Sequence, residues 1–173
     1  MNCRARVGEM VKIILPVLLL AVLDSGLAST AWAQNKACAL ATPEELQAAL
    51  GAKVSGLKAQ GLGGDAQICM GQTPAASVML RLAKRTHSSG ETEAKGIEMA
   101  KKMGAQVELK TFGPVTCSTM IPPPNLAQYG FNTTCSVLKN GQVAAVEVTA
   151  KSQKEMVAID KLRPLVEKMA GRI

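Results

Sequence analysis

The chain has 173 residues, a formal net charge of +7 and very few aromatic residues: one Trp, one Tyr and two Phe. Many basic proteins hold single-stranded nucleic acid by stacking its bases on aromatic side chains. Because this chain has so few aromatic residues, we predict no nucleic-acid partner. The positive charge alone is typical of a solvated, lysine-rich surface and identifies no partner.

The first 33 residues have the pattern of a secretory signal peptide. Three basic residues precede an apolar run over residues 13–23, and Ala-Trp-Ala at 31–33 forms a small-residue cleavage site. The run is about half of the roughly 20 apolar residues that span a bilayer, so we expect cleavage rather than anchoring. The sequence therefore predicts a removed segment over 1–33, one globular domain over 34–173 without a transmembrane segment, and a periplasmic or secreted location.

Four cysteines remain after the predicted cleavage: Cys38, Cys69, Cys117 and Cys135. An even number in an exported chain predicts two disulfides. Three pairings are possible, and Cys38–Cys69 with Cys117–Cys135 is favoured because each pair closes a loop of modest size. Each bridge would stabilise the domain by roughly 3–4 kcal/mol.

Helix signals mark three segments of the mature chain. Thr42-Pro43-Glu44-Glu45 is a capping box with proline at the first helical position, which predicts a helix over about 43–50. A second helix is expected from Ser88 to a stop at Gly104. Ser152 and Glu155 suggest the cap of a final helix whose apolar face runs from residue 156 to 169.

Alternating apolar residues and turn signals predict seven strands between these helices. They cover about 54–59, 66–71, 77–84, 107–112, 115–120, 131–138 and 143–150. Hairpin-linked strands with few helices indicate an α+β class: an antiparallel sheet of about six to seven strands with two or three helices on one face. Residues 50–54 resemble 103–107, which either a duplicated helix-plus-strands unit or chance similarity explains.

The segment from Cys38 to Gly51 resembles the opening of a broad group of bacterial exported proteins and lipoproteins of unknown function. It has the pattern Cys-x-Leu-x-Thr-x-x-Glu, followed by a short helix that ends in Leu-Gly. The chain departs from the lipoprotein members because it lacks a lipid-acceptor cysteine. The resemblance implies a Cys38–Cys69 bridge and an α+β domain, and it implies no activity.

A proline-rich loop is the most distinctive candidate for partner binding. Pro122, Pro123 and Pro124 are held extended and lead to Tyr129 and Phe131, a composition that suits peptide or partner contact. The alternative is a stiff connector with both aromatic side chains in the core. From this loop we predict a non-enzymatic binding or interaction module for a protein, a peptide or a small apolar ligand.

Two other functions remain open. Met99 and Met103 lie four residues apart on a predicted helix and, with His87, could bind monovalent copper, although methionine also fills irregular cores. His87 is the only histidine, so a hydrolase would need it, although a solvated loop position explains it as well. The sequence contains no nucleophile elbow, redox Cys-x-x-Cys or phosphate loop, so we predict no catalytic residue and no cofactor.

Overall fold

A computed structural model describes residues 35–61 and 66–173, without the side chains of residues 61 and 87–93. The predicted signal peptide over 1–33 and the Gly-rich turn at 62–65 lie outside the described residues. No helix in the described ranges is long and apolar enough to cross a membrane.

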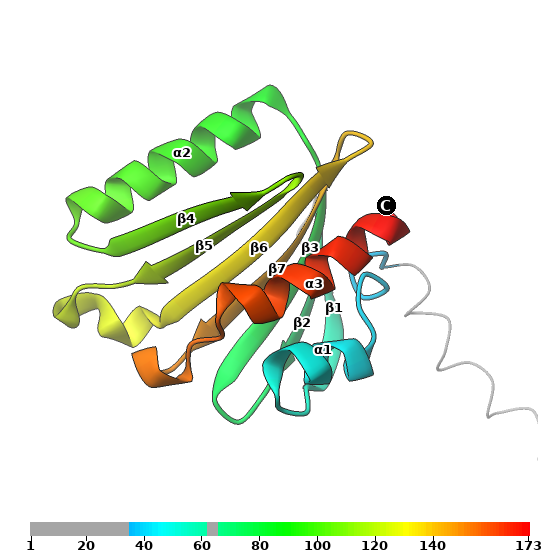
Figure 1. Cartoon of the computed structure of the whole chain (residues 1–173), viewed down its shortest axis with the longest axis horizontal. Helices are drawn as coiled ribbons and strands as arrows, with labels where there is room; N and C mark the ends of the chain where they lie inside the picture. The colour runs from blue at the N-terminus through cyan, green and yellow to red at the C-terminus, as the bar shows by residue number, and fades with distance from the viewer. Residues whose placement is uncertain (1–34, 62–65) are drawn as a thin grey trace, which may run out of the picture. The chain divides into compact units, whose positions relative to one another are not determined.

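The described chain forms a seven-stranded sheet with three α-helices (Figure 1). Every pair of neighbouring strands is antiparallel, and the strand order is β1-β2-β3-β7-β6-β5-β4. The predicted α+β class is therefore confirmed. The elements are α1 (Pro43–Leu50), β1 (Ser55–Gly61), β2 (Ala66–Gln72), β3 (Ala76–Lys84), α2 (His87–Lys102), β4 (Gln106–Phe112), β5 (Val115–Ile121), β6 (Phe131–Lys139), β7 (Gln142–Ala150) and α3 (Ile159–Met169), with short 3-10 helices η1 (Pro124–Tyr129), η2 (Gln153–Glu155) and η3 (Ala170–Arg172).

The two faces of the sheet follow from side-chain alternation along the central strands β3 and β7. Leu80 pairs with Val146, and both side chains are fully buried on what we call the packed face. Met79 pairs with Glu147, and both lie on the opposite face, which we call the cleft face. Alternation therefore separates an apolar surface from a partly polar one within the same two strands.

The helices divide between these faces. In Figure 1, α3 crosses in front of the sheet with α1 beside it, and residues of both belong to the core of the packed face. Helix α2 runs along β4 and lies over the cleft face, where Ile97 and Ala100 approach the sheet. The sequence predicts two or three helices on one face, and two helices, α1 and α3, share the packed face, because side chains of both belong to its core.

The core contains almost no aromatic side chain, as the composition predicts. Its largest fully buried side chains are Leu40, Leu46, Leu80, Leu162, Met169, Val78, Val115, Val137, Val146, Val148, Val166 and Thr133. Phe112 and Phe131 pack against its border. Thr133 is satisfied because its hydroxyl donates a hydrogen bond to the carbonyl oxygen of Val157 at 2.8 Å.

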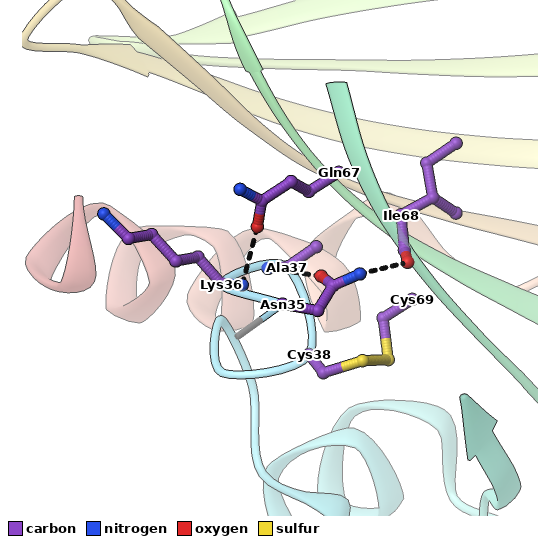
Figure 2. The surroundings of a disulfide bond; sticks show 7 residues. All are labelled: Asn35, Lys36, Ala37, Cys38, Gln67, Ile68 and Cys69. Carbon is purple, nitrogen blue, oxygen red and sulfur yellow. Dashed lines mark hydrogen bonds between the residues drawn. A yellow bond between two sulfur atoms is a disulfide. The ribbon is translucent and has the colours of Figure 1, made fainter. Parts of the chain in front are cut away.

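Both favoured disulfides are present, and both lie on the packed face. Cys117 and Cys135 are directly opposite each other on β5 and β6. Cys38 ties the segment before α1 to Cys69 on β2 (Figure 2). Hydrogen bonds add to this attachment, because the Asn35 side-chain amide donates to the Ile68 carbonyl oxygen at 3.1 Å.

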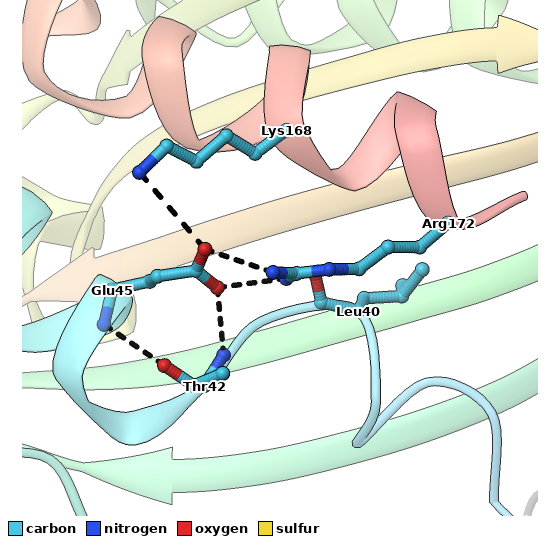
Figure 3. A network of polar contacts seen from close by, with 5 residues as sticks. All are labelled: Leu40, Thr42, Glu45, Lys168 and Arg172. Carbon is cyan, nitrogen blue, oxygen red and sulfur yellow. Dashed lines mark hydrogen bonds and ion pairs between the residues drawn. The ribbon is translucent and has the colours of Figure 1, made fainter.

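A polar clamp joins α1 to the C-terminal residues (Figure 3). Glu45 accepts hydrogen bonds from the Arg172 guanidinium at 2.7 and 2.8 Å, and its carboxylate also accepts one from the Thr42 backbone N–H at 3.0 Å. The predicted capping box is confirmed, since the Glu45 N–H donates to the Thr42 hydroxyl. The Arg172 hydrogen bonds, followed by the Thr42 backbone bond, lower the pKa of Glu45 to about 2.

The final helix begins later than the capping signal predicts. Ser152 and Glu155 bond to each other through their side chains at 3.0 Å and enclose only the short η2, so the prediction of a helix cap there is wrong. Met156 and Val157 pack against the core, and the Val157 carbonyl oxygen accepts a hydrogen bond from the Thr133 hydroxyl. Tertiary contacts therefore outweigh the local signal, and α3 starts at Ile159.

The similarity between residues 50–54 and 103–107 marks two helix-to-strand junctions at opposite edges of the sheet, before β1 and before β4. The central hairpins β2–β3 and β6–β7 also correspond, because Cys69 pairs with Leu80 and Cys135 with Val146. The correspondence does not extend to the helices, since α1 and α2 cover opposite faces.

Candidate functional site

A cleft of about 630 Å³ lies between α2 and the cleft face of the sheet. This volume falls within the range of small-molecule sites, which occupy roughly 300–1,000 Å³. The roof comes from α2 and the floor from five strands: β3, β7, β6, β5 and β4. Ala100 is the only buried side chain among those described for α2, and it keeps 9% of its surface exposed, so this helix covers the sheet without filling the space beneath it.

Strand register arranges the floor of the cleft in rows. The middle row crosses the sheet from Met79 through Glu147 and Thr134 to Ser118. A second row lies next to it and contains Asn132 and Met120, which pair with each other. The floor therefore presents hydroxyl, amide and carboxyl groups between two methionine side chains.

Glu147 is the only carboxylate among the described residues that line the cleft. It stands near the middle of the sheet, half-buried between Met79 and Thr134. Burial raises the pKa of this carboxyl group, and the charge of Arg81 opposes that rise only partly. The site thus holds a carboxyl group whose ionised form lacks a close ion-pair partner within the described chain.

Asn132 contributes a second acceptor. Its Oδ1 atom is buried and accepts no hydrogen bond from the described protein groups. Buried polar atoms nearly always have a partner, because an unmade hydrogen bond costs about 1–3 kcal/mol. Since Asn132 lines the cleft, a molecule bound there could supply the missing donor.

One end of the cleft is basic. Arg81 and Lys84 of β3 line it together with Thr86, which precedes α2. Arg81 pairs with Ala145, one row from Glu147 on the side away from Asn132. The cleft is therefore polarised, with cationic groups toward one end and uncharged acceptors beyond Glu147.

The residues of the proline-rich loop differ in their exposure to solvent. Pro124 begins η1, while Pro122 and Pro123 are half-buried. Tyr129 is 71% exposed, whereas Phe131 packs against the core. Phe131 is partly buried and thus offers a partner only part of its surface, and the alternative in which both aromatic side chains lie in the core is wrong for Tyr129.

Tyr129 lines a smaller groove of about 340 Å³. The other walls come from the β2–β3 turn and the end of β7, where the Lys151 ammonium donates to the Pro74 carbonyl oxygen at 3.0 Å. Gly130, with a φ of 89°, allows the chain to pass this close, because a Cβ there would lie 2.4 Å from Thr149 Cγ2.

The copper hypothesis combines His87 with two methionines at the other end of α2, where Met103 caps the helix and its backbone N–H bonds to the Met99 carbonyl oxygen. Met99 and Met103 are 63% and 55% exposed, so the alternative that they fill the core is wrong. His87 is the first residue of α2, and its side chain lies outside the described atoms. Met99 lies twelve positions after His87 on the helix, which corresponds to about 18 Å along its axis. Within the described chain, no three His, Cys, Asp or Glu residues are grouped to hold a metal.

Local signals marked the cleft residues only weakly. Glu147 is the only charged residue of β7, which is the one signal that could have singled it out. Asn132 and Thr134 occupy alternate positions of β6, yet such alternation is equally typical of a strand with one wet face. No local pattern indicates that α2 lies over this face.

Comparisons with known proteins identify no relative. The chain matches no protein-family model, and no curated protein or solved structure is significantly similar to it. The resemblance to exported proteins of unknown function stays a prediction.

Proposed function

We propose that this protein is an exported, non-enzymatic binding module that holds a small organic molecule in the cleft between α2 and the sheet. The observation that carries the proposal is a cleft of about 630 Å³ whose floor contains the unsatisfied Asn132 Oδ1 beside the half-buried Glu147. Burying a polar group without a hydrogen-bond partner costs free energy, so these groups favour a bound ligand that supplies the missing hydrogen bonds.

Export is supported by two features. The N-terminal 33 residues have the composition of a signal peptide. The chain also forms two disulfides. Disulfides persist in oxidising compartments and are rare in the cytosol. A periplasmic or secreted location is therefore part of the proposal.

Binding is favoured over catalysis by the groups that line the cleft. Among its described residues, Glu147 is the only carboxylate, and none of the others is a histidine or a cysteine that could act with it as an acid–base or nucleophilic pair. The uncharged polar groups are hydroxyls and an amide, which orient a ligand without exchanging protons with it.

The chain offers a matched pair of variants that tests the site. Gly96 lies in the roof of the cleft, and a Cβ there would meet open space. Gly96→Leu should fill the cleft, while Gly96→Ala should make the same gain in helix propensity, about 1 kcal/mol, with little filling. A thermal-shift screen of small amphipathic molecules would supply ligands, and calorimetry would measure their affinities.

We expect Gly96→Leu to weaken ligand binding at least tenfold and Gly96→Ala to leave it nearly unchanged. Both variants should be folded by circular dichroism. Ligands that bind Gly96→Leu as tightly as the parent protein would place the binding site elsewhere.

The groove beside Tyr129 is a second candidate, for contact with another protein. Its support is the 71% exposure of Tyr129 at the rim of that groove. Tyr129→Ala should remove partners captured from envelope extracts without altering small-molecule binding in the cleft. An unchanged set of partners would count against this surface.

A further inference from the structure

The polar groups at the centre of the cleft are hydrogen-bond acceptors. Asn132 Oδ1 is buried without a donor, and the Glu147 carboxyl group has no ion-pair partner within 4.0 Å in the described chain. The hydroxyls of Ser118 and Thr134 lie in the row of Glu147 and can rotate to donate or accept. A complementary ligand must therefore bring donors to this position.

The two acceptors lie close enough to serve one ligand group. Glu147 pairs with Thr134, and Asn132 is two residues before Thr134 on the same face of β6. Residues in this diagonal relation are about 7–8 Å apart between their backbones, within reach of side chains that converge on one donor. Both acceptors belong to the central strands β6 and β7, so neither depends on a loop.

The charges along the cleft determine where a cation could lie. Arg81 lies one row from Glu147, and Asn132 lies one row from Glu147 in the opposite direction. A positive group between Glu147 and Asn132 is therefore on the far side of the carboxylate from Arg81. This separation reduces the repulsion that the basic end would otherwise exert.

The surroundings of this position are apolar. Ile97 and Ala100 form the roof, and the thioethers of Met79 and Met120 flank the two acceptors on the floor. Methionine adapts to ligands of irregular shape because its side chain is unbranched and polarizable. An apolar body joined to the donor group would fill this space.

We propose, on the basis of the proposed function, that the cleft selects ligands with a primary ammonium or guanidinium group attached to an apolar body, with Glu147 and Asn132 as the recognising residues. An ammonium has three donors and no acceptor, and a guanidinium has several donors in a fork, so either satisfies both oxygens at once. A carboxylate at the same position would face the Glu147 carboxylate and leave Asn132 Oδ1 without a donor.

Four probes of equal chain length test this proposal on the full mature protein: n-hexylamine, hexylguanidine, 1-hexanol and hexanoate. Titration calorimetry at pH 7.5 and low ionic strength would compare their affinities. We expect the two cationic probes to bind at least tenfold more tightly than 1-hexanol and hexanoate to bind most weakly. Gly96→Leu should weaken all binding.

Glu147→Gln should reduce the affinity for n-hexylamine to that for 1-hexanol, and Asn132→Leu should reduce it severalfold. Glu98→Gln is the control, because Glu98 is exposed on α2 and does not line the cleft. Melting curves of all variants would show that the losses are not due to unfolding. Loss of amine affinity in Glu147→Gln but not in Glu98→Gln supports the assignment of Glu147.

The failures of the two proposals are distinguishable. If 1-hexanol or hexanoate binds as tightly as n-hexylamine and Gly96→Leu weakens that binding, the cleft binds ligands but the preference for cations is wrong. An amine affinity that Glu147→Gln leaves unchanged would also overturn it. Cationic binding that survives in Gly96→Leu would contradict the cleft itself, as would the absence of saturable binding by all four probes.

Discussion

The two faces of the sheet are built from the same strands and differ in almost every other respect. The packed face carries both disulfides, the apolar stripes of α1 and α3, and the Glu45–Arg172 clamp. The cleft face carries one loosely packed helix over a floor that includes Glu147 and Asn132. Stability is therefore concentrated on one face, which leaves the other free to keep an open cleft and polar groups that a core would not tolerate.

Removing both disulfides should have the largest effect on the stability of the packed face. Replacing all four cysteines by alanine should remove about 6–8 kcal/mol, comparable with the whole stability of a domain this size. We expect the variant to be unfolded or nearly so at 25 °C by circular dichroism. A cooperative unfolding transition with a melting temperature within a few degrees of the parent protein's would show that the packed face does not depend on its disulfides.

A pair of truncations on the two helices compares the faces directly. Leu162 of α3 is fully buried, and Leu162→Ala should cost about 2–5 kcal/mol. Ile97 of α2 is half-buried beside the cleft, so Ile97→Ala should cost less than about 1 kcal/mol. Urea unfolding would measure both, and similar losses would contradict the division between the faces.

The clamp should make the packed face sensitive to acid. Because its folded-state pKa of about 2 lies below the ordinary value of 4.5, Glu45 stabilises the fold above pH 4.5, and this contribution is lost as the pH falls toward 2. Glu45→Gln should therefore cost about 1–2 kcal/mol at pH 7, limited by partial exposure to solvent, and almost nothing at pH 2. Unfolding curves across this range would check the sign, and a cost independent of pH would contradict it.

Glu147 should behave in the opposite way on the cleft face. Burial raises the pKa of Glu147 above its ordinary value of 4.5. As the pH rises above 4.5, ionisation of this carboxyl group therefore lowers the free energy of unfolding, whereas at lower pH the group is protonated in both states and has no such effect. Glu147→Gln should thus raise the melting temperature by about 1–3 °C at pH 7, with no difference near pH 3. Glu98→Gln provides the comparison, and a drop in melting temperature at pH 7 would show that Glu147 is a structural residue.

The elements of the sheet could be predicted from sequence more fully than the site. Strand β3 carries a period of two along its whole length, and the turn residues Asn140-Gly141 clearly separate β6 from β7. The late start of α3 could not be predicted, because the hydrogen bond from Thr133 to Val157 joins residues 24 positions apart. The cleft could not be predicted for a similar reason: nothing within α2 specifies which face of the sheet it covers.

The measurement that tests the ligand site most directly is amide chemical-shift mapping during titration with n-hexylamine. We predict that the largest changes will fall on Ile97 and Ala100 of α2 and on residues 132–134 and 145–147 of the cleft face, while the amides of α3 and of Tyr129 stay nearly constant. Changes centred on the Tyr129 groove, or spread evenly over both faces, would contradict the assignment of the cleft as the binding site.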